Sequence, residues 1–280
     1  MDNDLASSGT HEGMLADAEG GRAADAVLRL SERDIRRHAR ARGPRAPITW
    51  ILMRQAYSET RLRLKRKIRF RHRDNSKACD AYCAMRPDEF ERVNARQAWA
   101  NWRTIPRNLD GVLPTWPVTI VDLCCGTGQS TAVLAWYAAA GSRVLGLEYN
   151  PRFVELARSR SYLGARGGEG GASVDVRFNA QSVLDTFRDD AGQPLAERSV
   201  DLVNASGSVG NHFDTAATRV LADEIDRVLK PRGVAMIDTG DAGTDAGTLS
   251  AIFVEKGFSV VHSAKSHPLD RYRQVCLRKG

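Results

Sequence analysis

From about residue 110 to the C-terminus, short continuous runs of apolar residues alternate with stretches in which apolar residues recur at helical spacing. Short apolar runs that end in polar or glycine-rich residues predict strands at Val118–Val121, Val144–Leu147, Val174–Phe178, Val200–Ala205 and Val234–Asp238. Between these runs, apolar residues recur at helical spacing, as in Pro151–Ser159 and in a helix expected to start at Asp214. The alternation of strands with helices predicts an α/β fold.

A helix with one apolar face is predicted just before this region. Its sequence, RPDEFERVNARQAWANWRTIP, opens with Pro87 and acidic residues, and Pro106 is expected to end it. Trp99 and Trp102 fall on one side of this helix. We therefore expect the side that carries these tryptophans to pack against the core.

The stretch VTIVDLCCGTGQST joins the first predicted strand to a helix through a glycine-rich turn. Glycines permit positive φ and close approach of a ligand, and the following helix N-terminus offers unpaired N–H groups. As the dinucleotide pattern GxGxxG, the turn has Thr131 in place of the third glycine. As the S-adenosylmethionine (SAM) methyltransferase pattern DxGxGxG, it matches at Asp122, Gly126 and Gly128. Cys124 then stands where the first glycine belongs, and this second pattern fits better.

The second predicted strand stops at Glu148, 22 residues after Gly126. An acidic side chain at this place can accept hydrogen bonds from both hydroxyls of a ribose, and a spacing of about 20 residues is typical of nucleoside-binding βαβ units. The alternative is that Glu148 is an ordinary surface carboxylate at a strand end, and from Glu148 alone the two interpretations are equally good. Together with the glycine turn, Glu148 favours nucleoside binding.

These features resemble the first two motifs of class I SAM-dependent methyltransferases. Arg227–Gly233 (RVLKPRG) is similar to the family's RVLKPGG turn before the fifth strand, and Asp201–Phe213 lies where the fourth strand and the substrate loop belong. The resemblance implies a Rossmann-like, seven-stranded, mostly parallel sheet with helices on both faces and the strand order 3-2-1-4-5-7-6. The last strand is antiparallel, and GFSVVHS and YRQVCLRK would form the final pair.

The resemblance implies SAM as the cofactor and a cofactor site at the carboxyl ends of the strands. The residues expected there are Asp122, Cys124, Gly126, Gly128, Glu148, Tyr149, Asn179, Ala180, Gln181 and Ser206. Asn179 replaces an acidic residue that commonly faces the adenine amino group, and its amide oxygen can still accept that hydrogen bond. The alternative is that Asn179 or Ser182 caps a helix.

Candidate catalytic residues lie after the fourth strand, where the family's substrate faces the cofactor. His212 is the candidate proton acceptor and Asn211 the candidate for orienting the substrate, with a purely structural loop histidine as the alternative. Helices before the first strand form a lid in related methyltransferases, so Tyr82, Trp102 and Arg103 are candidate lid residues. Asp238 and Asp241 follow the fifth strand and offer oxygens to a substrate or a divalent ion, but without a third acidic ligand we assign no metal.

The chain divides by composition into three parts. Residues 1–30 have few large apolar side chains and are expected to be a disordered leader. Residues 31–108 are expected to form a basic N-terminal helical extension with the helical lid, and residues 109–280 the methyltransferase domain. The polar N-terminus and the five cysteines, an odd number, indicate a cytoplasmic protein with reduced thiols.

The positive charge is concentrated in the extension, because residues 31–77 hold 16 Lys or Arg against 4 Asp or Glu. The run RLRLKRKIRFRHR is compatible with a surface that meets nucleic acid or an anionic membrane. Nucleic acid is not favoured, because no RNA-binding module is recognisable and Phe70 is the one aromatic residue in the run. A solvated helix face, an arm that neutralises an acidic patch on the catalytic domain and a strand edge are the alternatives. No NPPY or DPPY follows the fourth strand, and by resemblance this disfavours the family branches that methylate exocyclic amines of nucleobases or glutamine side chains. O- or N-methylation of a small molecule is then the leading expectation. The alternatives are an RNA methyltransferase and a non-catalytic SAM-binding regulatory protein. The oligomeric state is not predicted.

Overall fold

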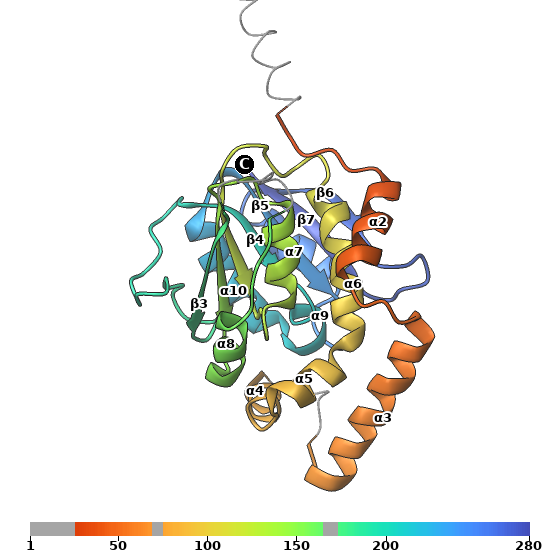
Figure 1. The fold of residues 1–280 in the computed structure, drawn as a ribbon. Helices are drawn as coiled ribbons and strands as arrows, with labels where there is room; N and C mark the ends of the chain where they lie inside the picture. Colours follow the sequence, from red (N-terminus) through yellow and green to blue (C-terminus); the bar gives the residue numbers. More distant parts are fainter. Residues whose placement is uncertain (1–25, 69–74, 165–172) are drawn as a thin grey trace, which may run out of the picture.

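A seven-stranded sheet forms the centre of the computed structural model, which describes residues 26–68, 75–164 and 173–280 (Figure 1). The strand order is β3-β2-β1-β4-β5-β7-β6, and β7 is antiparallel to both of its neighbours. Both features confirm the predicted class I topology. The strands are β1 (Thr119–Leu123), β2 (Arg143–Glu148), β3 (Asp175–Ala180), β4 (Val200–Ala205), β5 (Leu229–Thr239), β6 (Phe258–Ala264) and β7 (Arg273–Lys279).

The central strands are apolar on both faces, as a sheet covered on both sides requires. Successive side chains point to opposite faces, so Ile120 and Leu202 enter one core cluster while Val121 and Val203 enter the other. This is why the sequence shows continuous apolar runs at these strands and no alternation of apolar with polar residues.

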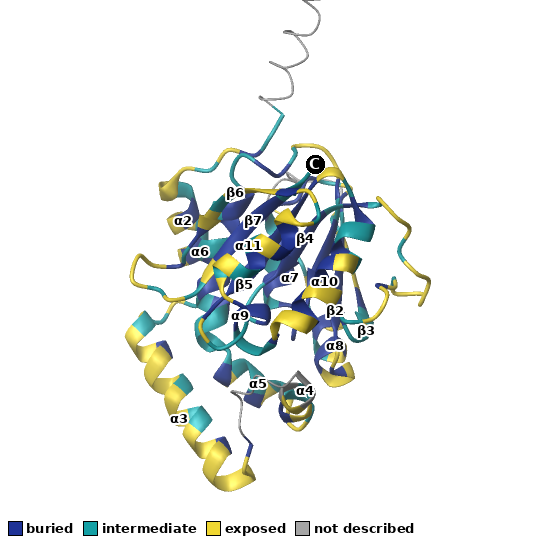
Figure 2. Cartoon of the chain, turned by 180° about the vertical axis from the view of Figure 1, so that it is seen from behind, coloured by how far each residue is buried: buried dark blue, intermediate teal, exposed yellow. Residues whose placement is uncertain are grey.

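Helices cover both faces of this sheet (Figures 1 and 2). On one face lie α6 (Ala95–Leu109), α7 (Gln129–Tyr137) and α8 (Pro151–Arg158), and on the other lie α10 (Thr215–Val228) and α11 (Ala246–Val254). Phe253 of α11 and Leu134 of α7 illustrate the two cores, since each is buried in a different cluster. A short helix, α9 (Val209–His212), follows β4 inside the loop predicted there.

The N-terminal extension is helical. It consists of α2 (Glu32–Arg42), α3 (Ile48–Arg66), α4 (Asn75–Cys83) and α5 (Pro87–Val93), which lead into α6. We refer to α4, α5 and α6 as the roof, because their residues line one side of the main pocket. The helix α3 runs along the outside of the molecule beside the roof (Figure 1).

Three local predictions differ from the structure. The helix predicted from Pro87 to Pro106 is two helices that meet at Asn94, and Pro106 lies inside α6 because that helix continues to Leu109. The fifth strand begins at Leu229 and so includes the KPRG segment, where the pairing with β4 is irregular. The stretch RLRLKR, for which a strand edge was an alternative, lies in α3.

The expected leader is only partly described. Residues 1–25 lie outside the described residues. Residues 26–30 already belong to the folded unit, because Leu28 is buried and its amide donates to the carbonyl of Leu113. Within the described part of the chain, the structure shows no helix long and apolar enough to span a membrane.

Candidate functional site

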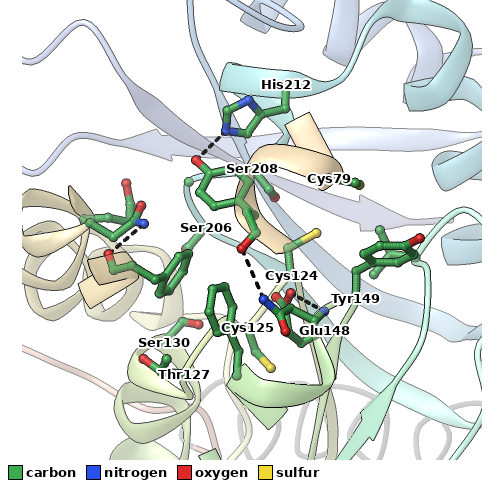
Figure 3. A pocket seen from close by; sticks show the side chains of 18 of the residues that line it. Cys79, Cys124, Cys125, Thr127, Ser130, Glu148, Tyr149, Ser206, Ser208 and His212 are labelled. Atoms are coloured by element: carbon green, nitrogen blue, oxygen red, sulfur yellow. Dashed lines mark hydrogen bonds between the residues drawn. The ribbon is translucent and has the colours of Figure 1, made fainter. Parts of the chain in front are cut away.

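The main pocket opens at the carboxyl ends of β1, β2 and β4 (Figure 3). The chain reverses its direction of travel across the sheet between β1 and β4, and such a switch point leaves a crevice where open α/β sheets bind ligands. Predicted residues whose side chains line this pocket are Tyr82, Cys124, Glu148, Tyr149, Gln181, Ser206 and His212. The sheet supplies the floor of the pocket and the roof closes the opposite side.

Asp122 lies beneath the pocket and is fully buried. Its carboxylate accepts hydrogen bonds from the hydroxyls of Ser130 (2.7 Å) and Thr131 (2.6 Å) in the first turn of α7, and from the Asn204 amide (2.7 Å) in β4. Burial raises the pKa of Asp122 to about 6, and these three donors oppose the shift. Asp122 therefore holds the glycine turn in place and is not itself part of the pocket wall.

The glycine turn has the backbone that its sequence pattern predicts. Gly126 and Gly128 have φ of 55° and 83°, in the region that favours glycine. Cys124 has φ of 51°, although it carries a side chain. A non-glycine residue in this region costs about 1–2 kcal/mol. The departure from the DxGxGxG pattern thus falls at a residue where glycine would be conformationally favoured.

Glu148 stands at the end of β2 in the pocket wall, and only 9% of it is exposed. Its two oxygens accept hydrogen bonds from the amides of Gly126 (2.9 Å) and Asn150 (2.9 Å). Burial raises the pKa of Glu148, and these backbone donors oppose the shift. A carboxylate has about four acceptor positions, so each oxygen can still accept from a ligand hydroxyl.

The roof touches the glycine turn and the loop after β4. The ring of Phe90 lies so close to Gly126 that a Cβ atom there would stand 2.7 Å from it, and Gln97 approaches Gly207 to the same degree. Glu91 accepts a hydrogen bond from the Thr127 hydroxyl (2.9 Å). The sequence did not single out these roof residues, and no local signal marks them, because their role depends on contacts across the fold.

Tyr82 of α4 and His212 of α9 meet across the pocket, with the Tyr82 hydroxyl 2.9 Å from Nε2 of His212 (Figure 3). Burial raises the pKa of Tyr82, so its hydroxyl keeps its proton at neutral pH. With that hydroxyl as donor, Nε2 is the acceptor nitrogen of a neutral His212. The structure thus joins one candidate lid residue to the candidate catalytic histidine.

Asn211 and Asp238, expected near the substrate after β4 and β5, form hydrogen bonds to backbone groups. The Asn211 side chain donates to the carbonyl of Gly207 (3.2 Å) and does not line the pocket. Asp238 accepts from the amides of Ser208, Val209 and Gly210 at 3.0–3.2 Å, so its oxygens hold the start of α9. Among the residues that the structure describes, no group of three or more His, Cys, Asp or Glu is arranged to hold a metal ion.

The remaining predicted residues lie at the edge of the pocket or outside it. Asn179 donates to the Gln181 side chain (3.0 Å) and does not line the pocket, although Gln181 does. Ala180 is also absent from the pocket wall. Trp102 is buried in the core beside α7, and Arg103 stacks on Trp99, with its guanidinium carbon 3.6 Å from the ring centre. Neither Trp102 nor Arg103 reaches the pocket.

Residues 120–233 match the family model described as "Methyltransferase domain". A demethylmenaquinone methyltransferase of Lactobacillus johnsonii is 34% identical to the chain over 121 residues, which are 42% of this chain and 43% of the relative. The chain therefore matches less than half the length of that curated relative.

Two solved structures of methyltransferases are similar to this chain at low sequence identity. A chain from the complex between the Haloferax volcanii Trm112 methyltransferase activator and a methyltransferase is 18% identical, with a TM-score of 0.50, 70% of this chain covered and 97% of that one. A TehB-like SAM-dependent methyltransferase of Corynebacterium glutamicum is also 18% identical, with a TM-score of 0.46, 62% of this chain covered and 85% of that one.

The raised pKa of Asp122 predicts a pH dependence of stability. The folded protein takes up this proton at about pH 6 and the unfolded chain near the ordinary value of 3.8. This carboxyl therefore stabilises the folded state most below that ordinary value, and its contribution falls by about 3 kcal/mol as pH rises through this window. The free energy of unfolding in urea, measured for wild type and Asp122→Asn, should show wild type losing stability relative to the variant from about pH 4 to 6. A constant difference would contradict the burial of a titrating group.

The positive φ of Cys124 predicts an unusual response to glycine. Cys124→Gly should leave the free energy of unfolding unchanged or raise it by up to about 1 kcal/mol, because the strain removed matches or exceeds the added freedom of the unfolded chain. Cys124→Val should lower it by at least about 1 kcal/mol, since a β-branched side chain is least tolerated there. Cys125→Gly is the matched control at a residue without positive φ, and it should be destabilising. If both glycine variants lose the same stability, the backbone argument is wrong.

Proposed function

From the premise that this chain carries a class I SAM-dependent methyltransferase domain, we propose that the main pocket binds SAM and that the protein methylates an O or N atom of a small molecule. The observation that carries the proposal is the placement of the glycine turn, a buried carboxylate and a Tyr–His pair around one pocket at the switch point of the sheet. Each group suits a different part of the reaction.

The cofactor side of the pocket fits an adenosyl group in its donors and acceptors. Glu148 can accept from two ribose hydroxyls while its amide partners keep it in place. The glycine turn contributes Cys124, Cys125 and Thr127 to the pocket wall. Gly126 and Gly128 themselves do not line the pocket, because Phe90 covers Gly126 and Tyr162 covers Gly128. Gln181 lines the wall after β3, where its side-chain oxygen accepts from Asn179 and from the Arg188 amide. Its side-chain nitrogen donates to the carbonyls of Ser182 and Thr186, so protein partners hold this side chain in place.

Bound SAM would supply an electrophilic methyl group on a sulfonium, which an acceptor atom displaces in line. The protein's main task is then to align the acceptor with that methyl group and to exclude water. The roof serves both purposes, because Tyr82, Phe90 and Gln97 close the pocket on the side away from the sheet.

A hydroxyl or protonated amine acceptor must lose a proton, and the Tyr82–His212 pair can take it. As the acceptor proton passes to the Tyr82 oxygen, the Tyr82 proton passes to Nε2 of His212, 2.9 Å away. The phenol is thereby regenerated and His212 carries the positive charge. Tyr82 would touch the substrate, and His212 would act through Tyr82.

A small acceptor is favoured by the enclosure of the pocket. The roof packs on the glycine turn and on the loop after β4, so its residues cover the pocket on the side away from the sheet. The curated relative is named for a small-molecule acceptor, demethylmenaquinone. Because that likeness covers less than half of either chain, we carry over the class of acceptor and not its identity.

Removing the wall carboxylate should weaken cofactor binding. Glu148→Ala loses a charged acceptor for the ribose hydroxyls, so titration calorimetry should show SAM affinity reduced by about 1–3 kcal/mol. Glu155→Ala, on the exposed side of α8, removes the same charge away from the pocket and should bind as wild type does. Unchanged SAM affinity in a folded Glu148→Ala protein would remove Glu148 from the cofactor site.

Breaking the Tyr–His pair should slow methyl transfer more than it weakens SAM binding. Tyr82→Phe and His212→Ala should each lower the transfer of labelled methyl from SAM to a small-molecule extract by about 10²-fold or more. Their effects should not add in the double variant, because both remove one relay. His267→Ala, outside the pocket, is the control. A wild-type rate in His212→Ala would show that His212 only holds the loop.

A further inference from the structure

The outer face of α3 carries four large apolar side chains in a single stripe. Trp50, Met53, Tyr57 and Leu64 are 53%, 65%, 68% and 72% exposed. Their spacings of three, four and seven residues place them on one side of a helix. Large exposed apolar side chains that gather in this way mark an interaction surface more often than scattered ones do.

This stripe is not an unfinished part of the core, because the opposite side of α3 already packs on the roof. Ile51 and Leu62 are buried there, and Gln55 accepts a hydrogen bond from the Arg96 amide (3.0 Å). Arg66 pairs with the buried Glu89 of α5 and donates to the carbonyl of Ala84. Figure 2 shows α3 at the margin of the molecule with most of its surface exposed.

Cations run beside the stripe. Arg54 and Arg61 lie four residues after Trp50 and Tyr57, and Lys65 lies four after Arg61, so all three share this side of the helix. Within the described part of the chain, none of these three cations forms an ion pair with a carboxylate. A second copy of the same face would repel this charge, so the fitting partner is anionic.

An anionic bilayer fits this face better than a nucleic acid does. A helix lying in the headgroup region buries its apolar stripe while its cations meet lipid phosphates, and Trp and Tyr are favoured at that depth. On single-stranded RNA only Trp50 and Tyr57 could stack, and they lie seven residues apart, about 10 Å along the helix. Met53 and Leu64 would then stay exposed to water.

We propose that the outer face of α3 docks the protein on anionic phospholipid bilayers, with the four apolar side chains in the headgroup region and Arg54, Arg61 and Lys65 on the phosphates. The docking surface lies on the helix that packs against the roof, so docking brings the roof of the pocket beside the membrane. The proposal does not depend on the methyltransferase activity.

Vesicle sedimentation of the full chain tests whether the three cations of α3 bind anionic lipid. Vesicles of phosphatidylcholine with phosphatidylglycerol should bind the protein, binding should fall with salt, and pure phosphatidylcholine should bind far less. The triple variant Arg54→Gln/Arg61→Gln/Lys65→Gln should bind roughly 100-fold more weakly. The control Arg33→Gln/Arg40→Gln/Arg271→Gln removes the same charge from other exposed positions and should bind as wild type does. Equal losses in the two triple variants would overturn the assignment to α3.

Quenching of tryptophan fluorescence tests whether the apolar stripe of α3 enters the bilayer. Brominated lipids in the same vesicles should quench part of the tryptophan fluorescence, and Trp50→Phe should abolish that quenching while vesicle binding persists. Met53→Ser/Leu64→Ser should weaken binding, whereas Val220→Ser/Leu269→Ser, at exposed apolar positions elsewhere, should not. Quenching that survives in Trp50→Phe, or binding to RNA homopolymer but not to vesicles, would sink the proposal. SAM affinity by calorimetry should stay unchanged in all α3 variants, which separates this result from any failure of the pocket assignment.

Discussion

The buried carboxylate of Asp122 is the interaction on which the geometry of the site depends. It joins the end of β1 to the first turn of α7 and, through Asn204, to β4. The oxygen of the Asn204 amide accepts in turn from Gln274 of β7 (2.8 Å), whose own oxygen accepts from Asn108 of α6 (2.8 Å). A polar chain thus crosses the sheet under the pocket, and every link lies in a low-dielectric interior where a lost partner is costly. The glycine turn is held from below before any ligand arrives.

Two further carboxylates repeat this arrangement at neighbouring strand ends. Glu148 holds the glycine turn through the Gly126 amide, and Asp238 holds the start of α9 through three backbone amides. In each case burial raises the pKa of the carboxyl group and the backbone donors oppose that shift. The amide hydrogen bonds thus offset part of the cost of burying the carboxylate. Irregular loops at the carboxyl edge of the sheet can therefore keep one conformation, which is what a site built on them requires.

The sequence predicted what depends on local pattern and failed on what depends on distant contacts. Apolar runs and the glycine turn were sufficient for the strand order once the family resemblance was recognised, and the topology is confirmed. The break at Asn94 was missed, and Pro106 does not end the helix as expected, because α6 continues to Leu109. Tyr82 and His212 are 130 residues apart, and their pairing follows only from how the roof lies over the sheet. No sequence spacing carries that information.

The roof lies outside the part of the chain that matches the family model, and this affects which residues can select the methyl acceptor. The matched family range, residues 120–233, contains the glycine turn, Glu148 and His212, but it ends before β7 and begins after the whole roof. Tyr82, Phe90 and their neighbours on the roof face the pocket from outside that range. If the shared range holds the cofactor, as proposed, then the roof residues that line the pocket outside that range would mainly determine the choice of acceptor. Substituting a pocket-facing roof residue such as Tyr82 should therefore affect the acceptor, while the buried chain through Asp122 still holds the cofactor side.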